Sequence, residues 1–248
     1  MHFAKSIVLI CFVCFMNSLS MALAQTTGVP AENSLYGSSF RENSRLYVID
    51  PETGEETLVG EMGVACTDLA FADQLLFGLS FTEFFRINPQ TGAVFQIRKH
   101  GYQDLNALVS APNSNSDFMY SAGVTDQNGQ GGNFVRINRS SGIATSVGTL
   151  GAGLTSAGDM EFYQGTLYAT VFQNDAETTR LATIDLRTGK AAVVGDLKFA
   201  KVWGLAVRNE IMFGVTADGL VLEIDPKTAR AKQIGRTRMV LGGLAKSP

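Results

Sequence analysis

A short run of alternating apolar and polar residues, followed by a tight polar turn, occurs five times along the chain. The copies cover residues 46–54, 85–92, 135–142, 182–189 and 222–229, and in each one an Asp or Asn opens a turn of the D-P-x-T-G type. Asp or Asn can accept a hydrogen bond from the backbone two residues on, and glycine supplies the positive φ that closes a hairpin. Ala229 replaces that glycine in the fifth copy, which predicts a strained or differently shaped turn there.

Three further strand patterns accompany each turn. One precedes it, at residues 35–37, 76–78, 119–121, 167–169 and 212–214, and one follows it, ending in an apolar residue and glycine in four of the five units. The third is a short apolar strand that begins at Asp68, Asn106, Asp159, Gly204 or Gly243. Four short strands repeated every 40 to 50 residues are typical of a propeller blade, and no sustained helical period competes with them. The pattern predicts an all-β, five-bladed β-propeller with four antiparallel strands per blade.

The two ends of the repeat region complement each other. The first unit starts in mid-blade, at Leu35-Tyr36-Gly37, and lacks an innermost strand, whereas the chain finishes with a lone strand of the innermost type around Leu241 to Lys246. We expect the C-terminal strand to pair with the N-terminal blade and close the ring, since this removes two open sheet edges.

The L-Y-x-I-D-x-x-T-G unit resembles the repeats of secreted bacterial β-propellers in the broad quinoprotein-dehydrogenase-like and YVTN-like group. The resemblance implies the fold but no single function, because such propellers serve many ends. A shorter stretch, Asp159–Phe162 followed by residues 167–175, is similar to a segment of the five-bladed glutaminyl cyclases. That likeness implies Glu161 as the acid that handles protons while a glutamine amine attacks its own amide.

The first residues have the pattern of a secretory signal peptide. Lys5 supplies positive charge, residues 7–16 are an apolar run of ten, and a more polar segment ends in Ala22-Leu23-Ala24. The run is too short to span a bilayer. We predict a signal peptide over 1–24, a lead-in over 25–33 and a single propeller domain over 34–248, in a secreted or periplasmic protein. An uncleaved anchor is the alternative.

Composition excludes several functional classes. With a net charge of −3 and a pI near 5.4, the chain lacks the basic surface that nucleic acid binding requires. The two histidines are too few for a His-rich metal site, and His100 is expected to be a solvated loop residue. Cys66 is the one cysteine after the signal, and we expect it to be buried and inert.

We predict a monomer that needs no cofactor, metal or membrane insertion. Oxygen-bearing side chains alternate in Asp126-Gln127-Asn128-Gly129, which leaves calcium as an alternative, although a glycine-rich surface loop is favoured.

Polar residues near the start of the innermost strands form the candidate ligand site: Asp68, Asp104, Asn106, Asp159, Glu161 and Trp203. We expect them around one mouth of the channel, on the face of the two longest polar loops, residues 124–132 and 173–179. The aspartates either form a polar pocket or cap backbone N–H groups between blades; capping is favoured, because glycine takes the same position in two blades. Trp203 either stacks on a ligand or wedges between blades.

These features predict a non-catalytic module that binds a protein, peptide or glycan on the long-loop face. The alternative is a propeller enzyme, either similar to glutaminyl cyclases through Glu161 or a glycoside hydrolase using paired carboxylates. One observation separates the two hypotheses: an enzyme of this kind needs Asp68, Asp159 and Glu161 to converge on one cavity.

Overall fold

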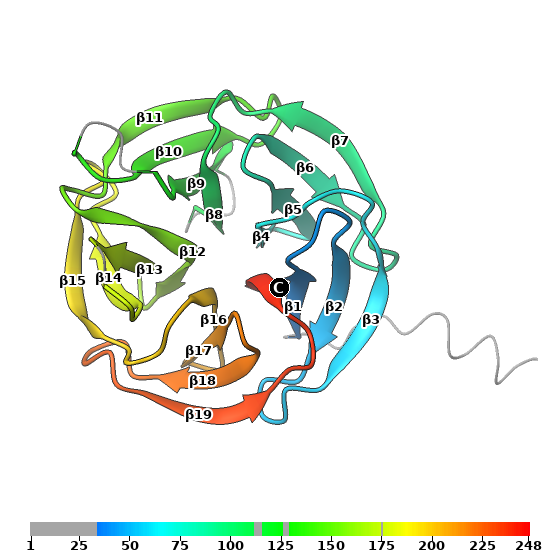
Figure 1. Ribbon diagram of the computed structural model, residues 1–248. Helices are drawn as coiled ribbons and strands as arrows, with labels where there is room; N and C mark the ends of the chain where they lie inside the picture. Colours follow the sequence, from blue (N-terminus) through cyan, green and yellow to red (C-terminus); the bar gives the residue numbers. More distant parts are fainter. Residues whose placement is uncertain (1–33, 112–115, 126–128, 175) are drawn as a thin grey trace, which may run out of the picture. The chain divides into compact units, whose positions relative to one another are not determined.

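The computed structural model describes residues 34–111, 116–125, 129–174 and 176–248, and its regular secondary structure there is entirely β-strand (Figure 1). Within these residues, twenty strands form five antiparallel, four-stranded sheets arranged in a ring. The predicted all-β, five-bladed propeller is therefore confirmed.

The strands of each blade follow in order from the innermost to the outermost. Blade 1 contains β20 (Leu241–Lys246), β1 (Leu35–Ser39), β2 (Arg45–Ile49) and β3 (Glu56–Glu61). Blade 2 contains β4 (Asp68–Ala72), β5 (Leu75–Leu79), β6 (Glu83–Ile87) and β7 (Val94–Lys99). Blade 3 contains β8 (Leu105–Ser110), β9 (Phe118–Gly123), β10 (Asn133–Asn138) and β11 (Ala144–Thr149). Blade 4 contains β12 (Leu154–Tyr163), β13 (Thr166–Gln173), β14 (Arg180–Ile184) and β15 (Ala191–Asp196). Blade 5 contains β16 (Val202–Arg208), β17 (Ile211–Thr216), β18 (Leu220–Ile224) and β19 (Ala231–Arg236).

The ring closes through the pairing of the last strand with the first. β20 runs antiparallel to β1, with Leu35 opposite Lys246 and Gly37 opposite Leu244 (Figure 1). Ser247 extends the pairing by donating its N–H to the Ser34 carbonyl oxygen at 2.9 Å. The predicted closure is thus confirmed.

The repeat turns bind neighbouring blades together. In the first turn, Asp50 Oδ1 accepts the N–H groups of Glu52 and Thr53 at 2.8 and 3.1 Å. The glycine that ends most outermost strands lies under the turn of an adjacent blade: a Cβ atom on Gly60 would overlap the carbonyl oxygen of Thr91. The apolar-Gly signature of these strands therefore records a close approach of two backbones.

Ala229 adopts the same turn as the glycines of the other copies. Its φ is 55°, and its N–H donates to the Asp225 carbonyl oxygen at 2.8 Å. The fifth turn is therefore strained in the left-handed region, as one of the two predicted outcomes required, but it is not differently shaped.

The described core lies between blades rather than inside one layer. It divides into five apolar clusters, each drawing its side chains mainly from two adjacent blades. Cys66 belongs to the cluster between blades 1 and 2, and burial raises the pKa of its thiol to about 11. The thiol is therefore inert, as expected.

His100 was expected in solvent, and that expectation is wrong. The residue is 1% exposed, because its main chain bonds to both neighbouring blades. Its N–H donates to the Thr82 carbonyl oxygen at 3.3 Å, and its carbonyl oxygen accepts the Ala144 N–H at 3.0 Å. Nδ1 accepts the Tyr102 N–H at 3.2 Å, and Nε2 lies 3.2 Å from the Ser80 carbonyl oxygen. This assigns the tautomer with the proton on Nε2, and burial lowers the pKa of the imidazole. His100 therefore fastens a loop.

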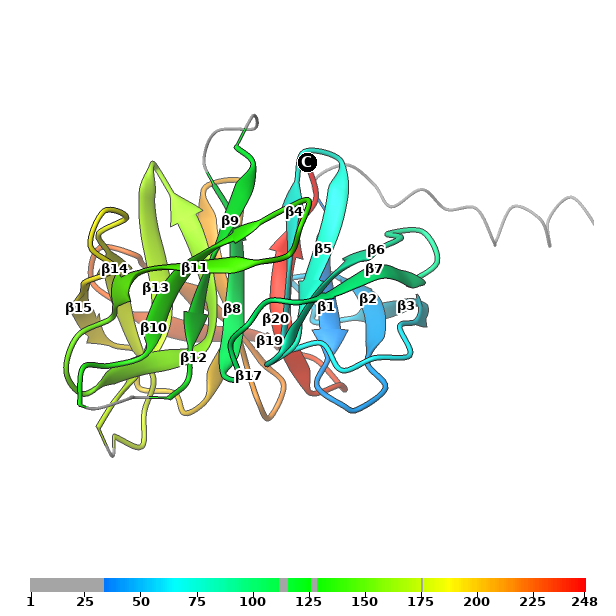
Figure 2. The ribbon, with the colours of Figure 1, turned by 90° about the horizontal axis from the view of Figure 1, so that it is seen from above.

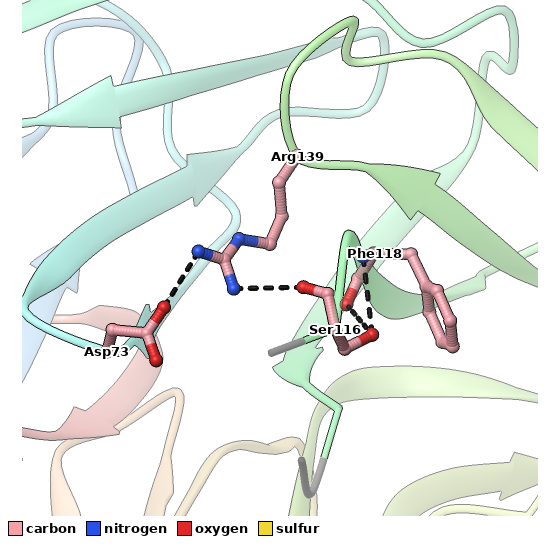
Figure 3. Close-up of polar contacts among 4 residues, drawn as sticks. All are labelled: Asp73, Ser116, Phe118 and Arg139. Carbon is pink, nitrogen blue, oxygen red and sulfur yellow. Dashed lines mark hydrogen bonds and ion pairs between the residues drawn. The ribbon is translucent and has the colours of Figure 1, made fainter. Parts of the chain in front are cut away.

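Arg139 joins blades 2 and 3 through Asp73 and Ser116 (Figure 3). Its Nη2 lies 2.8 Å from Asp73 Oδ2, and its Nη1 donates to the Ser116 carbonyl oxygen at 3.0 Å. The guanidinium carbon is 5.8 Å from the centre of the Phe77 ring. This arginine occupies the position that is proline in three of the repeat turns. It replaces a rigid turn residue with a link between blades.

Substitution of Arg139 by alanine is expected to lower the free energy of unfolding by about 1 kcal/mol, because a partly buried, charge-assisted pair is lost. Chemical denaturation measures the change. Arg45→Ala is the control: Arg45 forms a 2.9 Å pair with Glu61 in solvent, and its removal should change stability little. Equal losses in the two variants would contradict the assignment of Arg139 as an inter-blade link.

Candidate functional site

Two buried aspartates lie where the five innermost strands meet. Asp68 on β4 accepts the N–H of Leu69 on its own strand at 2.7 Å and the N–H of Leu108 on β8 at 2.6 Å. Its side chain has no exposed surface. The inner edge of each innermost strand has no further strand to pair with, so its N–H groups need another acceptor. Asp68 satisfies that need for blades 2 and 3.

Asp159 on β12 serves the other three blades. It accepts from Met160 on its own strand at 2.6 Å, from Leu205 on β16 at 2.7 Å and from Leu244 on β20 at 3.0 Å. Two carboxyl groups thus bind one inward N–H group from every blade. The structure thus shows the predicted capping of backbone groups between blades. Asp68, Asp159 and the five N–H groups that they bind cross the centre of the ring, and we call them the strap.

The two carboxyl groups also hydrogen-bond each other. Burial raises the pKa of both, and the negative charge of Asp159 raises the pKa of Asp68 further. Asp159 accepts three N–H groups and Asp68 two, which favours the proton on Asp68. A Cβ atom on Gly243 would overlap Asp68 Oδ1. The glycine in this position of blade 1 therefore makes room for the carboxyl group of its neighbour.

Glu161 lies two residues after Asp159 on β12, nearer the end of that strand. It accepts the N–H of Phe162 at 2.7 Å and the N–H of Val207 on β16. Burial raises the pKa of its carboxyl group to about 7, while the charge of Lys246 opposes that shift. Glu161 and Lys246 line a cavity of about 280 Å³ where the innermost strands end, which we call the far cavity. Figure 2 shows β8 and β20 running along the ring axis, so this cavity and the strand starts lie on opposite faces.

A second cavity, of about 160 Å³, lies where the innermost strands begin. Four aromatic side chains line it, and we call it the aromatic mouth: Phe40, Phe81, Phe172 and Trp203, around Asn106. Phe40 and Phe81 are 41% and 39% exposed. The rings of Phe40 and Trp203 are 5.0 Å apart, so Trp203 both wedges against blade 1 and borders the opening.

The sequence pattern places Asn106 at the same level of the ring as Asp68, but in the structure it lies one residue nearer the start of the innermost strands. An irregularity in the β8–β9 register between Leu105 and Ala107 places Ala107, not Asn106, beside Asp68. Asn106 instead shares its layer with Thr67, Gly158, Trp203 and Gly242, one residue per blade. Its side chain is buried, and no described residue donates a hydrogen bond to its Oδ1.

Asp104 lies just before β8 and fastens a neighbouring loop. Its Oδ2 accepts the Thr125 N–H at 3.3 Å, and its main-chain carbonyl accepts the Val124 N–H at 2.9 Å. It does not line either cavity.

The predicted site residues therefore separate into three places. Asp68 and Asp159 are enclosed in the middle of the ring, Glu161 opens to the far cavity, and Asn106 and Trp203 border the aromatic mouth. The three carboxyl groups do not share one accessible cavity, which was the arrangement required by the enzyme hypothesis. Ligand binding by these residues stays a prediction.

Sequence reasoning missed the phenylalanines of the aromatic mouth. Each lies five residues after the first core residue of the second strand in its blade, as Phe40 follows Leu35 and Phe81 follows Leu76. Blades 3, 4 and 5 carry Val124, Phe172 and Ala217 at this position. Alignment of the repeats beyond the ends of the strands could have found this ring.

The described residues also bear on metal binding and on membrane insertion. Within the part of the chain that the structure describes, no group of three or more His, Cys, Asp or Glu could hold a metal ion. The alternative of a calcium ion at Asp126–Gly129 is not tested, because residues 126–128 lie outside the described part. The same residues include no helix with the length and apolarity to cross a membrane.

Comparison with solved structures agrees with the propeller fold. The structure is similar to TolB from Acinetobacter baumannii, with 12% identity and a TM-score of 0.51 over 87% of this chain and 55% of that one. It is also similar to a structural genomics protein of unknown function from Bacteroides thetaiotaomicron, with 15% identity and a TM-score of 0.56 over 82% of this chain and 55% of that one. The chain thus spans about half the length of either structure, and identities this low show the fold alone.

No curated protein matches the sequence. A family described as a domain of unknown function, DUF4394, matches residues 22–206, which is most of the chain. The protein therefore belongs to the DUF4394 family.

Proposed function

We infer that this protein is a non-catalytic binding propeller that captures an apolar side chain of a protein or peptide in its aromatic mouth. The observation that carries the proposal is the convergence of exposed aromatic side chains from several blades on one cavity. Partly exposed aromatic residues around a central depression are typical of the energetic centre of a binding surface. Such a cluster is costly in water unless a partner covers it.

The size and lining of the cavity favour a peptide over a glycan. At about 160 Å³ it is smaller than the pockets of roughly 300–1000 Å³ that enclose whole small molecules, so a single large side chain fits it better. Thr67 and Asn106 are the polar side chains in its described lining. A sugar ring would leave most of its hydroxyl groups without partners there.

The carboxyl groups support binding rather than catalysis. Asp68 and Asp159 have no exposed surface, so a glycoside could not reach them. Glu161, which the likeness to glutaminyl cyclases implies as an acid, already accepts two backbone N–H groups. Its place on the far side of the strap also separates it from the aromatic mouth.

The predicted signal peptide supports a location outside the cytoplasm, either secreted or periplasmic. Residues 1–24, on which this rests, lie outside the described residues. The described parts of the long loops, around Val124 and Gln173, adjoin the aromatic mouth and could extend the surface that a partner covers.

To test the proposal, random peptides that bind the protein are first selected. Their affinities for the protein and for two matched variants are then measured. Phe81→Ala removes a 39% exposed ring at the mouth, and Phe95→Ala removes a 41% exposed ring on the outermost strand β7. We expect Phe81→Ala to weaken binding by about tenfold or more and Phe95→Ala to leave it nearly unchanged. Trp203 is the single tryptophan of the chain, so its fluorescence reports binding at the mouth directly.

Selected peptides should carry an aromatic or large aliphatic residue and should change the Trp203 emission. If peptides bind both variants as tightly as the unchanged protein, the partner surface is elsewhere. If no peptide is enriched over a blank support, the assignment of the mouth as a peptide-binding site fails.

A further inference from the structure

The inner edges of the five innermost strands present their N–H groups in layers. The first layer contains Leu69, Leu108, Met160, Leu205 and Leu244, all bound by Asp68 and Asp159. N–H groups point to alternate sides along a strand, so those two residues further on also face the channel. This second layer contains Phe71, Ser110, Phe162, Val207 and Lys246. The bonds from Phe162 and Val207 to Glu161 confirm the alternation.

Only part of the second layer has a carboxylate. Glu161 accepts from blades 4 and 5, but no side chain of the described residues accepts from the N–H of Phe71, Ser110 or Lys246. These three residues belong to β4, β8 and β20, which are neighbours around the ring. In the first layer, two carboxyl groups accept five N–H groups. The second layer has one carboxyl group, which accepts two N–H groups, and the three N–H groups that remain are adjacent.

The sequence explains the difference between the layers. Blade 4 has acids at both layers, Asp159 and Glu161, whereas blade 2 has Asp68 followed by Ala70. Ala70 lines the far cavity together with Phe71, Ser110 and Lys246. The space that a second glutamate would fill is therefore part of the cavity of about 280 Å³.

The charges around this space suit an anion. Lys246 lines the cavity, and its ammonium group lies close enough to Glu161 to affect the pKa of that carboxyl group. Burial raises the pKa of Glu161 to about 7, so at neutral pH a large share of this residue is uncharged. Backbone N–H groups that converge on one point, with a cation beside them, are a recurrent arrangement for binding oxyanions.

We propose that the far cavity binds the carboxylate group of a ligand, held by the N–H groups of Phe71, Ser110 and Lys246 and by the Lys246 ammonium group. The ligand carboxylate takes the role in the second layer that Asp68 has in the first. This site is separate from the aromatic mouth, so it does not depend on the function proposed above.

The proposal is tested by supplying the carboxylate from the chain itself. Ala70→Glu should place an acid beside Phe71 and Ser110 as Asp68 is placed beside Leu69 and Leu108. Ala70→Met is the matched control, because its side chain has a similar length but no strong acceptor. We expect Ala70→Glu to melt about 2–4 °C higher than Ala70→Met, since buried donors gain a partner.

Binding is followed by the amide resonances of the ¹⁵N-labelled protein during titration with sodium acetate, succinate and N-acetyl-aspartate amide, at constant ionic strength against sodium chloride. The resonances of Phe71, Ser110 and Lys246 should shift and saturate, while those of Leu69 and Leu108 stay nearly fixed. Lys246→Met should weaken binding at least fivefold, and Ala70→Glu should abolish it. A response to acetate and succinate assigns a free small acid, whereas one confined to the blocked aspartate assigns a peptide carboxylate.

Two results would overturn the proposal. One is an equal response of the three amides to chloride and to all three carboxylates. The other is a melting temperature of Ala70→Glu no higher than that of Ala70→Met.

Discussion

Removal of residues 241–248 is expected to abolish cooperative folding of the propeller. These residues contain β20, whose Leu241, Leu244 and Ala245 are buried in the described core. The deletion opens the edge of β1 and takes away one of the N–H groups that Asp159 binds. Closure of the ring joins contacts from the two ends of the chain, so its loss should affect every blade. Circular dichroism during heating should show no sharp transition.

Two further variants separate ring closure from general damage. Removal of residues 247–248 alone leaves β20 intact and should cost little by comparison. A circular permutant that joins Ser247 to Ser34 through a short Gly-Ser linker, with new ends in the exposed turn at residues 140–141, should retain the cooperative transition. The backbone atoms of Ser34 and Ser247 are already hydrogen-bonded at 2.9 Å, so the linker spans a short distance. If the protein that lacks residues 241–248 melts like the full chain, closure through β20 is disproved.

Substitution of Asp159 by alanine is expected to lower the free energy of unfolding by about 3–5 kcal/mol. The change leaves three buried N–H groups without an acceptor, on Met160, Leu205 and Leu244, and each unsatisfied donor costs about 1–3 kcal/mol. It also removes the partner of the Asp68 carboxyl group. Chemical denaturation measures the loss. Asp159→Asn, which keeps one acceptor oxygen, should lose less.

The same carboxyl pair predicts how stability depends on pH. The pKa values of Asp68 and Asp159 are raised in the folded state, so the folded protein holds their protons more tightly than the unfolded chain does. The contribution of the pair to stability is therefore complete below about pH 4 and falls as the pH rises through the raised pKa values. Asp68→Asn cannot ionise at this position. Its stability should decline less steeply with pH than that of the unchanged protein.

Asp185→Ala is the control for position. Asp185 also accepts two backbone N–H groups, at 2.8 and 3.1 Å, but it lies in an exposed repeat turn where water can replace it. A loss at Asp159 no larger than that at Asp185 would show that the central strap is not a main support of the ring.

The local pattern determined most of the fold. Strand alternation, the Asx turns and the glycine of the outermost strands are short-range features, and together they specified the blade and the number of blades. Closure also followed from the sequence, because an innermost strand missing at one end was present at the other. The burial of Cys66 needed only its apolar surroundings and the absence of a second cysteine after the predicted signal.

The candidate site depended on relations between blades that no single strand contains. An irregularity in one strand pair moved Asn106 out of the layer of Asp68, and bonds from a connection to two neighbouring blades buried His100. Asp68, Asp159 and Glu161 look alike in sequence, yet a step of two residues along β12, from Asp159 to Glu161, separates the enclosed carboxyl pair from an open cavity. The four aromatic residues of the aromatic mouth lie at positions 40, 81, 172 and 203, far apart in the sequence. Their approach is set by the packing of neighbouring blades around the ring, and so only the tertiary structure decided which polar and aromatic groups meet.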